Sequence, residues 1–269
     1  MVNICVKDCI TARVHIGHLS KKWDPRMSKY IFSKVGDRHI INVQKTIEGL
    51  EVACQNLKEI VASGKRVLFV ATKKQVRDYI TGIASEVNMP YVTQRWLGGT
   101  LTNFITIKKL LKRKDYDEKT INSESFKLLN KKERHAFVRR HNKRNTILSG
   151  ISEMYRLPGA LIVIDVKKEK IAVAEARRMN IPVIAIVDTN SDPSYIDNVI
   201  PANDDALDSA KLIIEEIKNS ISEGRQVYLA EKEKNDISNK NDADNEENKD
   251  LKTNRKSTDN NEKRIKRKR

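Results

Sequence analysis

The sequence lacks the long apolar run that a membrane-spanning helix requires. None of its 269 residues lies in an apolar stretch of about 18 or more, the length that marks a transmembrane candidate. The first residues also lack the basic, apolar and small-residue series of a secretory signal and the Arg- and Ser-rich pattern of an organelle import leader. We therefore expect a cytoplasmic protein without a membrane partner.

Cysteine is scarce, which excludes a disulfide-stabilised fold. Cys5, Cys9 and Cys54 are odd in number and widely spread, as is typical of reduced thiols in a cytoplasm. Cys5 and Cys9 could suggest a metal knuckle, but no second ligand pair follows at zinc-finger spacing. Two small residues near the start of a helix explain the pair as well. We expect no cofactor.

Glycine-rich phosphate loops are missing, and this counts against an enzyme. Apolar residues 67–71 form the first strand of an expected α/β sheet, and Thr72-Lys73-Lys74-Gln75 follows instead of a glycine cluster. The sequence contains no Gly-x-x-x-x-Gly-Lys-Ser/Thr and no His-Glu-x-x-His motif. Because doubly wound sheets often bind nucleotides beyond the carboxyl ends of their strands, the alternative function is a nucleotide- or sugar-phosphate-binding enzyme without its glycine loop.

Positive charge is what the sequence has in excess. The chain carries a formal net charge of +16 and a pI of about 9.7. Residues 231–269 hold 13 Lys and Arg against 10 Asp and Glu, so the other residues carry +13. This excess implies a polyanionic partner, either nucleic acid or an anionic membrane surface.

Strands and helices alternate through the central region. Apolar runs at 67–71, 161–166 and 182–187 contain no polar residue inside them apart from Asp165, a pattern typical of parallel strands covered on both faces. Shorter segments at 91–93 and 199–200 bring the expected sheet to about five strands. Helices are expected at 44–63, which Gly64 would end, and at 75–87, 168–179 and 204–223.

This alternation divides the chain into three parts. Residues 1–45 form an N-terminal arm, with a short helix near 6–14, an irregular basic and aromatic stretch, and an extended segment at 39–43. Residues 46–230 form the α/β domain. Residues 231–269 form a disordered charged tail, because almost no apolar residue is present to offset the entropy of folding. The basic run at the end of the tail could grip RNA, or the tail could have little role.

Residues 104–150 interrupt the alternation and predict an antiparallel helical hairpin. Ile105, Ile107, Leu110 and Leu111 give one amphipathic helix, and residues 126–148 give a second one, with a polar turn at about 117–125. Residues 108–144 contain 14 Lys and Arg against 5 Asp and Glu. A merely solvated helix face usually mixes its charges, so this excess favours contact with phosphates or with an acidic protein.

The segment Arg95-Trp96-Leu97-Gly98-Gly99-Thr100-Leu101-Thr102-Asn103 is the most informative one. Its arginine can bind phosphate, its tryptophan can pack against a base or a neighbouring chain, and Thr102 or Asn103 can cap the helix that follows. A Gly-Gly turn beside a core tryptophan explains the segment equally well from local chemistry alone.

The same segment resembles the signature of bacterial-type small-subunit ribosomal protein two. Further blocks match this family in its order, and together they span roughly residues 5–227. The blocks are Val14–His18, Lys22–Met27, Tyr30–Phe32, His39–Asn42, Val67–Lys73, Leu157–Ala160, Ile181–Val183, Val187–Pro193 and Ile200–Ala206. Each string alone is a weak signal, but their order and spacing are specific. The tail after about residue 230 departs from the family.

The resemblance implies a flavodoxin-like three-layer fold and a structural, non-enzymatic role in the small (30S) ribosomal subunit. It also implies a place on the solvent side between head and body, contact with small-subunit (16S-type) ribosomal RNA and neighbouring ribosomal proteins, and help in docking the mRNA-binding ribosomal protein one. We expect no homo-oligomer. The residues expected to face RNA or partners are Lys21, Lys22, Trp23, Arg26, Lys29, Tyr30, Lys73, Lys74, Arg95, Trp96, Lys108, Lys109, Lys112 and Arg113.

Carboxylates gather after the last two expected strands. Asp188 and Asp192 follow one strand, and Asp204 and Asp205 follow the next, so the two groups should lie close together. Clustered carboxylates can hold a hard cation, and His18 from the arm is a further candidate ligand. The plainer interpretation is that these residues cap the following turn and helix.

Overall fold

A parallel sheet of five strands forms the centre of the protein in this computed structural model, which describes residues 4–233 apart from the side chains of Ser125 and Lys127. The strands follow the order β5-β4-β6-β7-β8, and all neighbours are parallel. Their bounds are β4 Val67–Val70, β5 Tyr91–Val92, β6 Ala160–Ile164, β7 Val183–Val187 and β8 Asn198–Pro201. In chain order this arrangement is 2-1-3-4-5, the flavodoxin-like order, so the expected fold class is confirmed.

The sheet separates two hydrophobic cores because successive side chains of a strand point to opposite faces. Ile162 and Ile164 of β6 pack into one core with Phe69, whereas Leu161 and Val163 pack into the other. All five residues of β6 are buried. This double burial explains why the central strands are recognisable as apolar runs.

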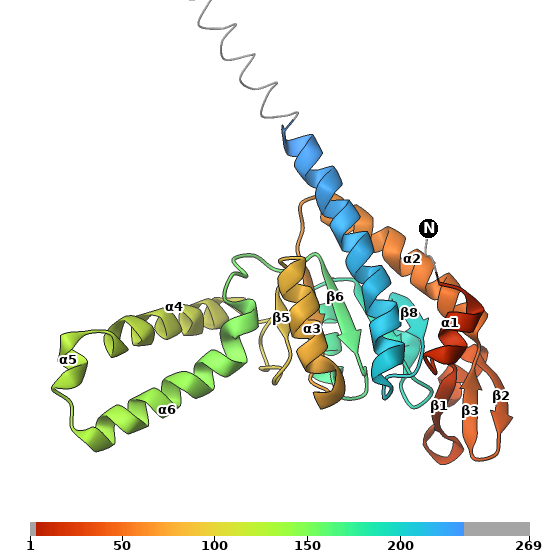
Figure 1. The fold of residues 1–269 in the computed structure, drawn as a ribbon, viewed down its shortest axis with the longest axis horizontal. Helices are drawn as coiled ribbons and strands as arrows, with labels where there is room; N and C mark the ends of the chain where they lie inside the picture. The colour runs from red at the N-terminus through yellow and green to blue at the C-terminus, as the bar shows by residue number, and fades with distance from the viewer. Residues whose placement is uncertain (1–3, 234–269) are drawn as a thin grey trace, which may run out of the picture. The chain divides into compact units, whose positions relative to one another are not determined.

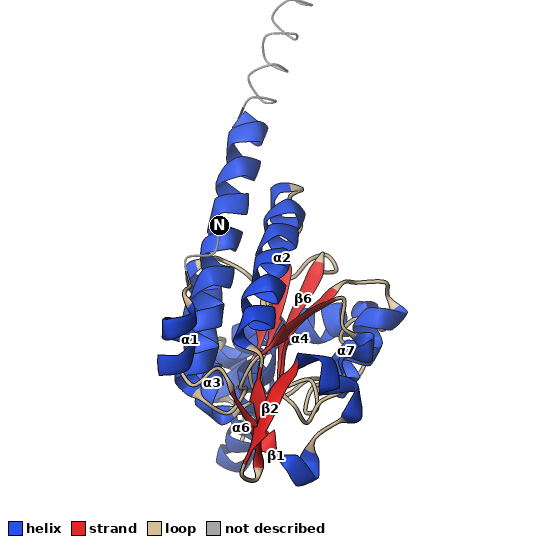
Figure 2. Ribbon diagram, turned by 90° about the vertical axis from the view of Figure 1, so that its right-hand side faces the viewer, coloured by secondary structure: helices blue, strands red, loops and turns tan. Residues whose placement is uncertain are grey.

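Helices cover both faces of the sheet, as Figure 2 shows. One core contains side chains of α2 (Val43–Ala62), α3 (Lys74–Glu86) and a helix over residues 207–225. The other contains side chains of α7 (Lys170–Arg178) and of the start of α4 (Phe104–Ile121). The chain therefore has the three layers of a doubly wound fold.

Helix α2 is the long connection into the sheet, and its ends follow the sequence. Asn42 accepts a hydrogen bond from the Gln44 backbone N–H at 3.0 Å and caps the first turn. Gly64 lies directly after Ser63, the last cap residue, with a φ of +78°, so the predicted C′ glycine is confirmed. At Gly49 the helix comes so close to β8 that an added Cβ would lie 2.4 Å from the Val199 carbonyl oxygen.

The N-terminal arm contains a small antiparallel sheet, which corrects the expected irregular stretch. After α1 (Val6–Thr11), the strands β1 (Ile16–Leu19), β2 (Ile31–Val35) and β3 (Arg38–Ile41) pair in the order β1-β3-β2. Two 3-10 turns, η1 (Ser20–Lys22) and η2 (Pro25–Tyr30), separate the first two strands. The register of both pairings shifts within the ladder, and such breaks obscure the alternation that marks a strand.

The arm is attached to the far end of the chain. The His18 backbone N–H donates to Thr189 Oγ1 at 3.0 Å, and the Asn203 side chain donates to the Arg13 carbonyl at 3.1 Å. Gly17 sits so close to this attachment that a Cβ there would lie 2.7 Å from Thr189 Cγ2. The arm therefore packs at the carboxyl ends of the central strands.

The helical hairpin is present and extends away from the sheet (Figure 1). It consists of α4, α5 (Glu124–Lys127) and α6 (Lys131–Leu148), and η3 (Ser149–Ile151) leads back to the sheet. The second helix ends at residue 148 as expected but begins at 131 instead of 126, and the turn expected at 117–125 begins only after Ile121. Asp117 is a buried residue inside α4 that pairs with Arg144 across the seam, and this distant partner keeps α4 helical to Ile121.

The last helix begins at residue 207, three residues later than expected. Asn203 Oδ1 accepts from the backbone N–H groups of Asp205 and Ala206 at 2.9 and 3.3 Å, so residues 204–206 form a capped turn.

The chain divides into two compact units at residue 225, and residues 226–233 of the second unit are helical. The rest of the expected tail lies outside the described residues. Within residues 4–233 no helix combines the length and apolarity needed to cross a bilayer.

Candidate nucleic-acid interface

The Arg95–Asn103 segment is held in place by one buried carboxylate, Glu175 of α7. Glu175 Oε1 accepts from the Trp96 indole N–H at 3.1 Å and from the Gly99 N–H at 2.8 Å. Its Oε2 accepts from the backbone N–H groups of Leu101 and Thr102 at 2.9 and 3.2 Å. Backbone donors that converge in this way need a small-residue turn, and Gly99 supplies it with a φ of +88°.

The ionised form of Glu175 is favoured by these bonds. Burial of the side chain raises its pKa, but the hydrogen bonds from Leu101, Trp96, Gly99 and Thr102 outweigh that effect and lower the pKa below its ordinary value. Glu175 is therefore a charged anchor inside the second core, and sequence reasoning missed it. One signal was available, because Glu175 occupies a buried position in α7 among Ala172, Val173 and Ala176.

This anchor determines what the segment can offer to a partner. Trp96 is only 8% exposed and belongs to the second core, so its placement fits the alternative of a Gly-Gly turn beside a core tryptophan. Arg95 is exposed beside it. Asn103 is the N-cap residue of α4, as expected, but its side chain makes no capping bond to the backbone and instead accepts from the Thr106 hydroxyl at 2.8 Å.

The hairpin presents its basic residues to solvent. Lys108, Lys109, Lys112 and Arg113 of α4 are all exposed, and among the described residues none of them has a carboxylate within ion-pair distance. Lys108 lies 4.9 Å above the ring of Phe104. The opposite edge of α4 is buried at Ile107 and Leu111. Helical spacing therefore separates an apolar seam from a cationic face.

The arm supplies a second group of cations. Lys21, Lys22 and Lys29 are exposed, and Lys29 Nζ lies 4.8 Å from the centroid of the Tyr30 ring. Trp23 is exposed and lies beside His39, with ring centroids 5.0 Å apart. These positions are compatible with contact to a partner. Arg26 differs, because its guanidinium already pairs with Asp192.

A cluster of charged side chains lies where the sheet ends. His18 Nδ1 is 2.8 Å from Asp188 Oδ2, and His18 Nε2 is 3.3 Å from Asp205 Oδ2. Lys73 Nζ is 2.9 Å from Asp204 Oδ1 and 2.6 Å from Asp205 Oδ1. The structure thus brings the predicted carboxylates and His18 together. It also turns Lys73 inward, whereas the sequence predicted that Lys73 faces RNA; the neighbouring Lys74 is exposed.

Burial makes this cluster unusual electrostatically. Desolvation and the nearby Asp188 carboxylate raise the pKa of Asp204 to about 6, and the hydrogen bond to Asp188 raises the pKa of His18. Asp204 Oδ2 has no hydrogen-bond partner among the described residues. His18, Asp188 and Asp204 offer one ligand atom each within 4.8 Å of one another, a spacing and ligand set that can hold a divalent cation.

Only some of the aspartates after β7 and β8 cap the following turn, as the plainer interpretation expected. Asp192 accepts from the Ser194 N–H at 2.9 Å and caps η4 (Pro193–Tyr195), and Asn203 caps the turn before the last helix. Asp188 accepts instead from the Thr189 hydroxyl at 3.0 Å, and Asp204 pairs with Lys73. Capping and charge pairing are therefore divided between neighbouring residues.

Comparison with known proteins gives one consistent result. The family model described as Ribosomal protein S2 matches residues 9–224. The chain is 48% identical over 227 residues to the small ribosomal subunit protein uS2 of Cytophaga hutchinsonii, and the aligned region covers 84% of this chain and 89% of that protein. It is 48% identical over 228 residues to the protein of the same name in Flavobacterium johnsoniae, with coverage of 85% and 90%. The protein of the same name in Karelsulcia muelleri is 47% identical over 216 residues, with coverage of 80% and 97%.

Proposed function

Because the chain belongs to the ribosomal protein S2 family, we propose that its exposed basic side chains hold it in the small ribosomal subunit by binding phosphates of 16S-type ribosomal RNA. A member of this family is a structural constituent of that subunit, acts in translation and binds ribosomal RNA and other ribosomal proteins. The proposal adds which residues make these contacts. We place the chain in the ribosome of the cytoplasm.

The cationic face of α4 is the observation that carries this proposal. Lys108, Lys109, Lys112 and Arg113 are exposed and lie apart from the carboxylates that neutralise other cations of the chain. Arg95 and Lys74 add to them, as do Lys21, Lys22 and Lys29 of the arm. Phosphate contacts of this kind supply affinity without reading base edges, so the shape of the RNA provides most of the specificity.

Two finer roles rest on the family alone. They are a place on the solvent side between head and body of the subunit, and help in docking the large mRNA-binding ribosomal protein one. Small subunits depleted of this protein should then retain less of protein one after gradient purification, and the amount should recover when the purified chain is added back. Equal amounts with and without the chain would contradict the docking role.

The role is structural, without chemical turnover. The loop after β4 carries no glycine cradle, and Lys73 is held by Asp204 and Asp205 rather than left for a phosphate. Asp188→Asn and Asp192→Asn should therefore alter folding or subunit assembly only. Hydrolysis of a nucleotide or sugar phosphate that disappears in both variants would support the enzyme alternative instead.

Cosedimentation tests the main proposal. The tagged full-length chain, expressed in its own cells, should run with small subunits in a sucrose gradient. A soluble pool with no tagged chain on the subunits would overturn the assignment.

We also propose that His18, Asp188 and Asp204 hold a divalent cation, because their ligand atoms converge and Asp204 Oδ2 lacks another partner among the described residues. Zn²⁺ or Mg²⁺ added to the chelator-treated chain should raise its melting temperature, and Asp204→Asn should abolish this rise. The matched control is Asp208→Asn, an exposed position four residues further along the chain. Equal stabilisation of both variants would show that the cation binds elsewhere.

A further inference from the structure

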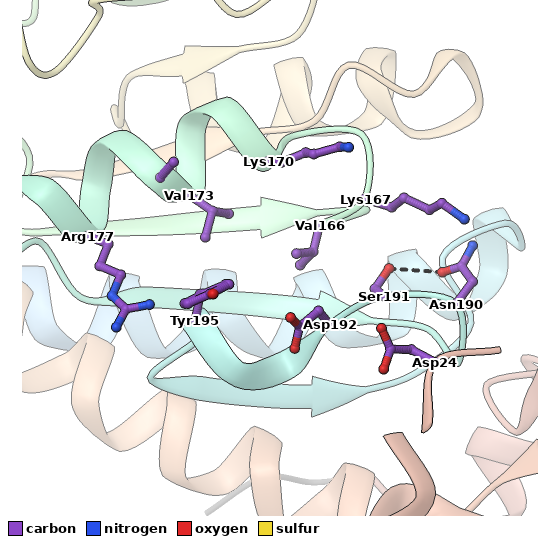
Figure 3. A pocket seen from close by; sticks show the side chains of 11 residues that line it. Asp24, Val166, Lys167, Lys170, Val173, Arg177, Asn190, Ser191, Asp192 and Tyr195 are labelled. Carbon is purple, nitrogen blue, oxygen red and sulfur yellow. Dashed lines mark hydrogen bonds between the residues drawn. The ribbon is translucent and has the colours of Figure 1, made fainter. Parts of the chain in front are cut away.

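A cavity of about 520 Å³ opens between α7 and the segments that follow β6 and β7 (Figure 3). Its size falls within the range of about 300–1,000 Å³ typical of small-molecule sites. It lies beyond the carboxyl ends of the strands, the edge at which doubly wound sheets bind ligands. None of the exposed lysines of the arm or hairpin lines it.

The inner surface of this cavity suits a flat apolar group. Val166 and Val173 are buried residues on its lining, and Ala174 lines it from an exposed position on α7. Tyr195, which is about half exposed, also lines the cavity, and the guanidinium of Arg177 lies 4.4 Å from the centroid of its ring. An aromatic ring and a guanidinium plane are the two surfaces on which an unstacked base can lie.

Two lysines without an ion-pair partner among residues 4–233 lie at the end of the cavity away from Arg177 and Tyr195. Lys167 and Lys170 are exposed, and in Figure 3 they lie apart from Arg177 and Tyr195. Among residues 4–233 neither lysine has a carboxylate within ion-pair distance. Two carboxylates, those of Asp24 and Asp192, also line the cavity. The guanidinium of Arg26 pairs with Asp192, and the backbone N–H of Arg26 donates to Asp24 Oδ1 at 2.9 Å. An anion is therefore favoured near the two lysines.

Polar groups suited to a base edge line the same cavity. The Ser191 hydroxyl donates to Asn190 Oδ1 at 2.9 Å, and both residues belong to the lining. A buried hydroxyl and a side-chain amide can exchange hydrogen bonds with the edge of a nucleobase. A flat lysine-rich surface would be enough to bind phosphate alone, so the hollow and its polar wall indicate a larger group.

We propose that this cavity receives a single unpaired nucleotide of RNA. The base lies against Val166, Val173 and Tyr195, and its phosphate lies at Lys167 and Lys170. The proposal rests on the RNA-binding function proposed above and adds that the chain recognises a bulged or looped nucleotide. A free nucleotide has the same chemistry, so the test must separate the two sources.

The test uses two RNA hairpins that differ only in one bulged 2-aminopurine, with the purified full-length chain. The chain should bind the bulged RNA about tenfold more tightly than the fully paired RNA, as base stacking on an aromatic side chain allows. Binding should also change the 2-aminopurine fluorescence. Ala174→Trp places a large side chain in the cavity and should remove both effects while leaving the affinity for paired RNA unchanged.

Matched variants keep the outcome interpretable. Ile171→Trp adds the same ring to an exposed position of α7 outside the cavity and should preserve the preference. Lys170→Gln should weaken binding of the bulged RNA more than Lys65→Gln, which changes an exposed lysine before β4. Folding of each variant is checked by its thermal unfolding.

Several results would overturn the proposal. They are equal affinity for both RNAs, a preference that survives Ala174→Trp, and saturable binding of AMP with no preference for the bulge. Binding of an acidic, tyrosine-containing peptide that Ala174→Trp abolishes, without any bulge preference, would assign the cavity to a protein partner. If the parent chain binds neither the bulged nor the paired RNA, the proposed RNA-binding function itself is refuted, because binding of the paired RNA depends only on the basic surface.

Discussion

Glu175 shows how one residue can organise a segment that looks like a ligand-binding loop. Its carboxylate accepts hydrogen bonds from an indole N–H and from several backbone N–H groups between Trp96 and Thr102. A buried donor that loses its acceptor costs more than the bond itself is worth. The conformation of the whole Arg95–Asn103 segment therefore depends on this one side chain.

Glu175→Gln should lower the free energy of unfolding by about 1–3 kcal/mol, because an amide cannot accept all of these bonds and adds its own donors. Urea unfolding followed by tryptophan fluorescence measures this change. Glu118→Gln, at an exposed position of α4, is the control and should stay within about 0.5 kcal/mol of the parent. Equal stabilities of the parent and Glu175→Gln would show that the bonds contribute little.

The same carboxylate predicts a dependence on pH. Folding lowers the pKa of Glu175, so its stabilising effect is complete above its unfolded pKa of about 4.3 and is lost as the pH falls through the lower folded pKa. The difference in unfolding free energy between the parent and Glu175→Gln should therefore be constant near neutral pH and shrink below about pH 4. A difference that grows in acid would contradict the assignment.

At this scale the sequence predicted residue types better than residue partners. It brought Asp188, Asp204 and Asp205 together because parallel strands end at one edge, and it gave His18 of the arm only as a further candidate ligand. It directed Lys73 and Trp96 to RNA, whereas their partners are Asp204 and Glu175. Those partners lie 131 and 79 positions away in the chain, and no local pattern reveals an interaction of that kind.

Among the elements, α2 and α3 provide a natural comparison of two helical glycines. A Cβ at Gly49 would meet the Val199 carbonyl oxygen of β8 at 2.4 Å, whereas a Cβ at Gly82 would meet no atom within 4 Å. Gly49→Ala should destabilise the protein by about 1–3 kcal/mol, since α2 must move away from the sheet. Gly82→Ala should stabilise it by about 0.5–1 kcal/mol. Thermal or urea unfolding distinguishes them, and the same sign for both would refute the close packing of α2.

The hairpin offers a second matched pair. Ile107 is 3% exposed and Ile105 is 72% exposed on the same helix. Ile107→Asp places a charge in the seam and should cost more than about 2 kcal/mol, with faster hydrogen exchange confined to residues 104–148. Ile105→Asp should leave exchange unchanged. If both variants exchange alike, the seam does not hold the hairpin together.

The success of prediction at this scale follows burial. The central strands β4, β6 and β7 are buried on both faces, so composition alone marked them, and the hairpin helices kept their 3.6-residue period. In the arm, the extended segment expected at 39–43 overlaps β3, but β1 and β2 were missed because they are short, largely half-exposed or exposed, and separated by two 3-10 turns. The end of α4 was misplaced because a polar residue, Asp117, is buried there against Arg144.

For the whole molecule, the excess of positive charge should dominate the affinity for RNA. If about five phosphates are neutralised, the logarithm of the binding constant should fall with the logarithm of salt concentration with a slope of about −4 to −5. Filter binding or anisotropy with ribosomal RNA fragments measures this slope. A binding constant that does not change with salt concentration would mean that the basic residues make no phosphate contacts and are only hydrated by solvent.

Replacing Lys108, Lys109, Lys112 and Arg113 with glutamine should leave the isolated chain folded, since all four are exposed. The salt slope should become shallower by roughly 1 for each phosphate that is no longer neutralised, and occupancy on the subunit should drop most at high salt. A change of four exposed residues outside the proposed interface, Lys7, Lys34, Lys65 and Arg178 to glutamine, is the control. Full occupancy of the hairpin variant at every salt concentration would make the hairpin a passive spacer.

The attachment of the arm sets an order of events during synthesis. His18 and Arg13 leave the exit tunnel before their partners Thr189 and Asn203, which follow 171 and 190 positions later. Closing a loop of that length is entropically costly until the sheet between the two ends exists. The arm is therefore made before the sheet but docks after it, and until then the charged cluster at the end of the sheet lacks His18. A nascent chain that stops before residue 189 lacks Thr189 and Asn203, the two groups to which the arm is attached.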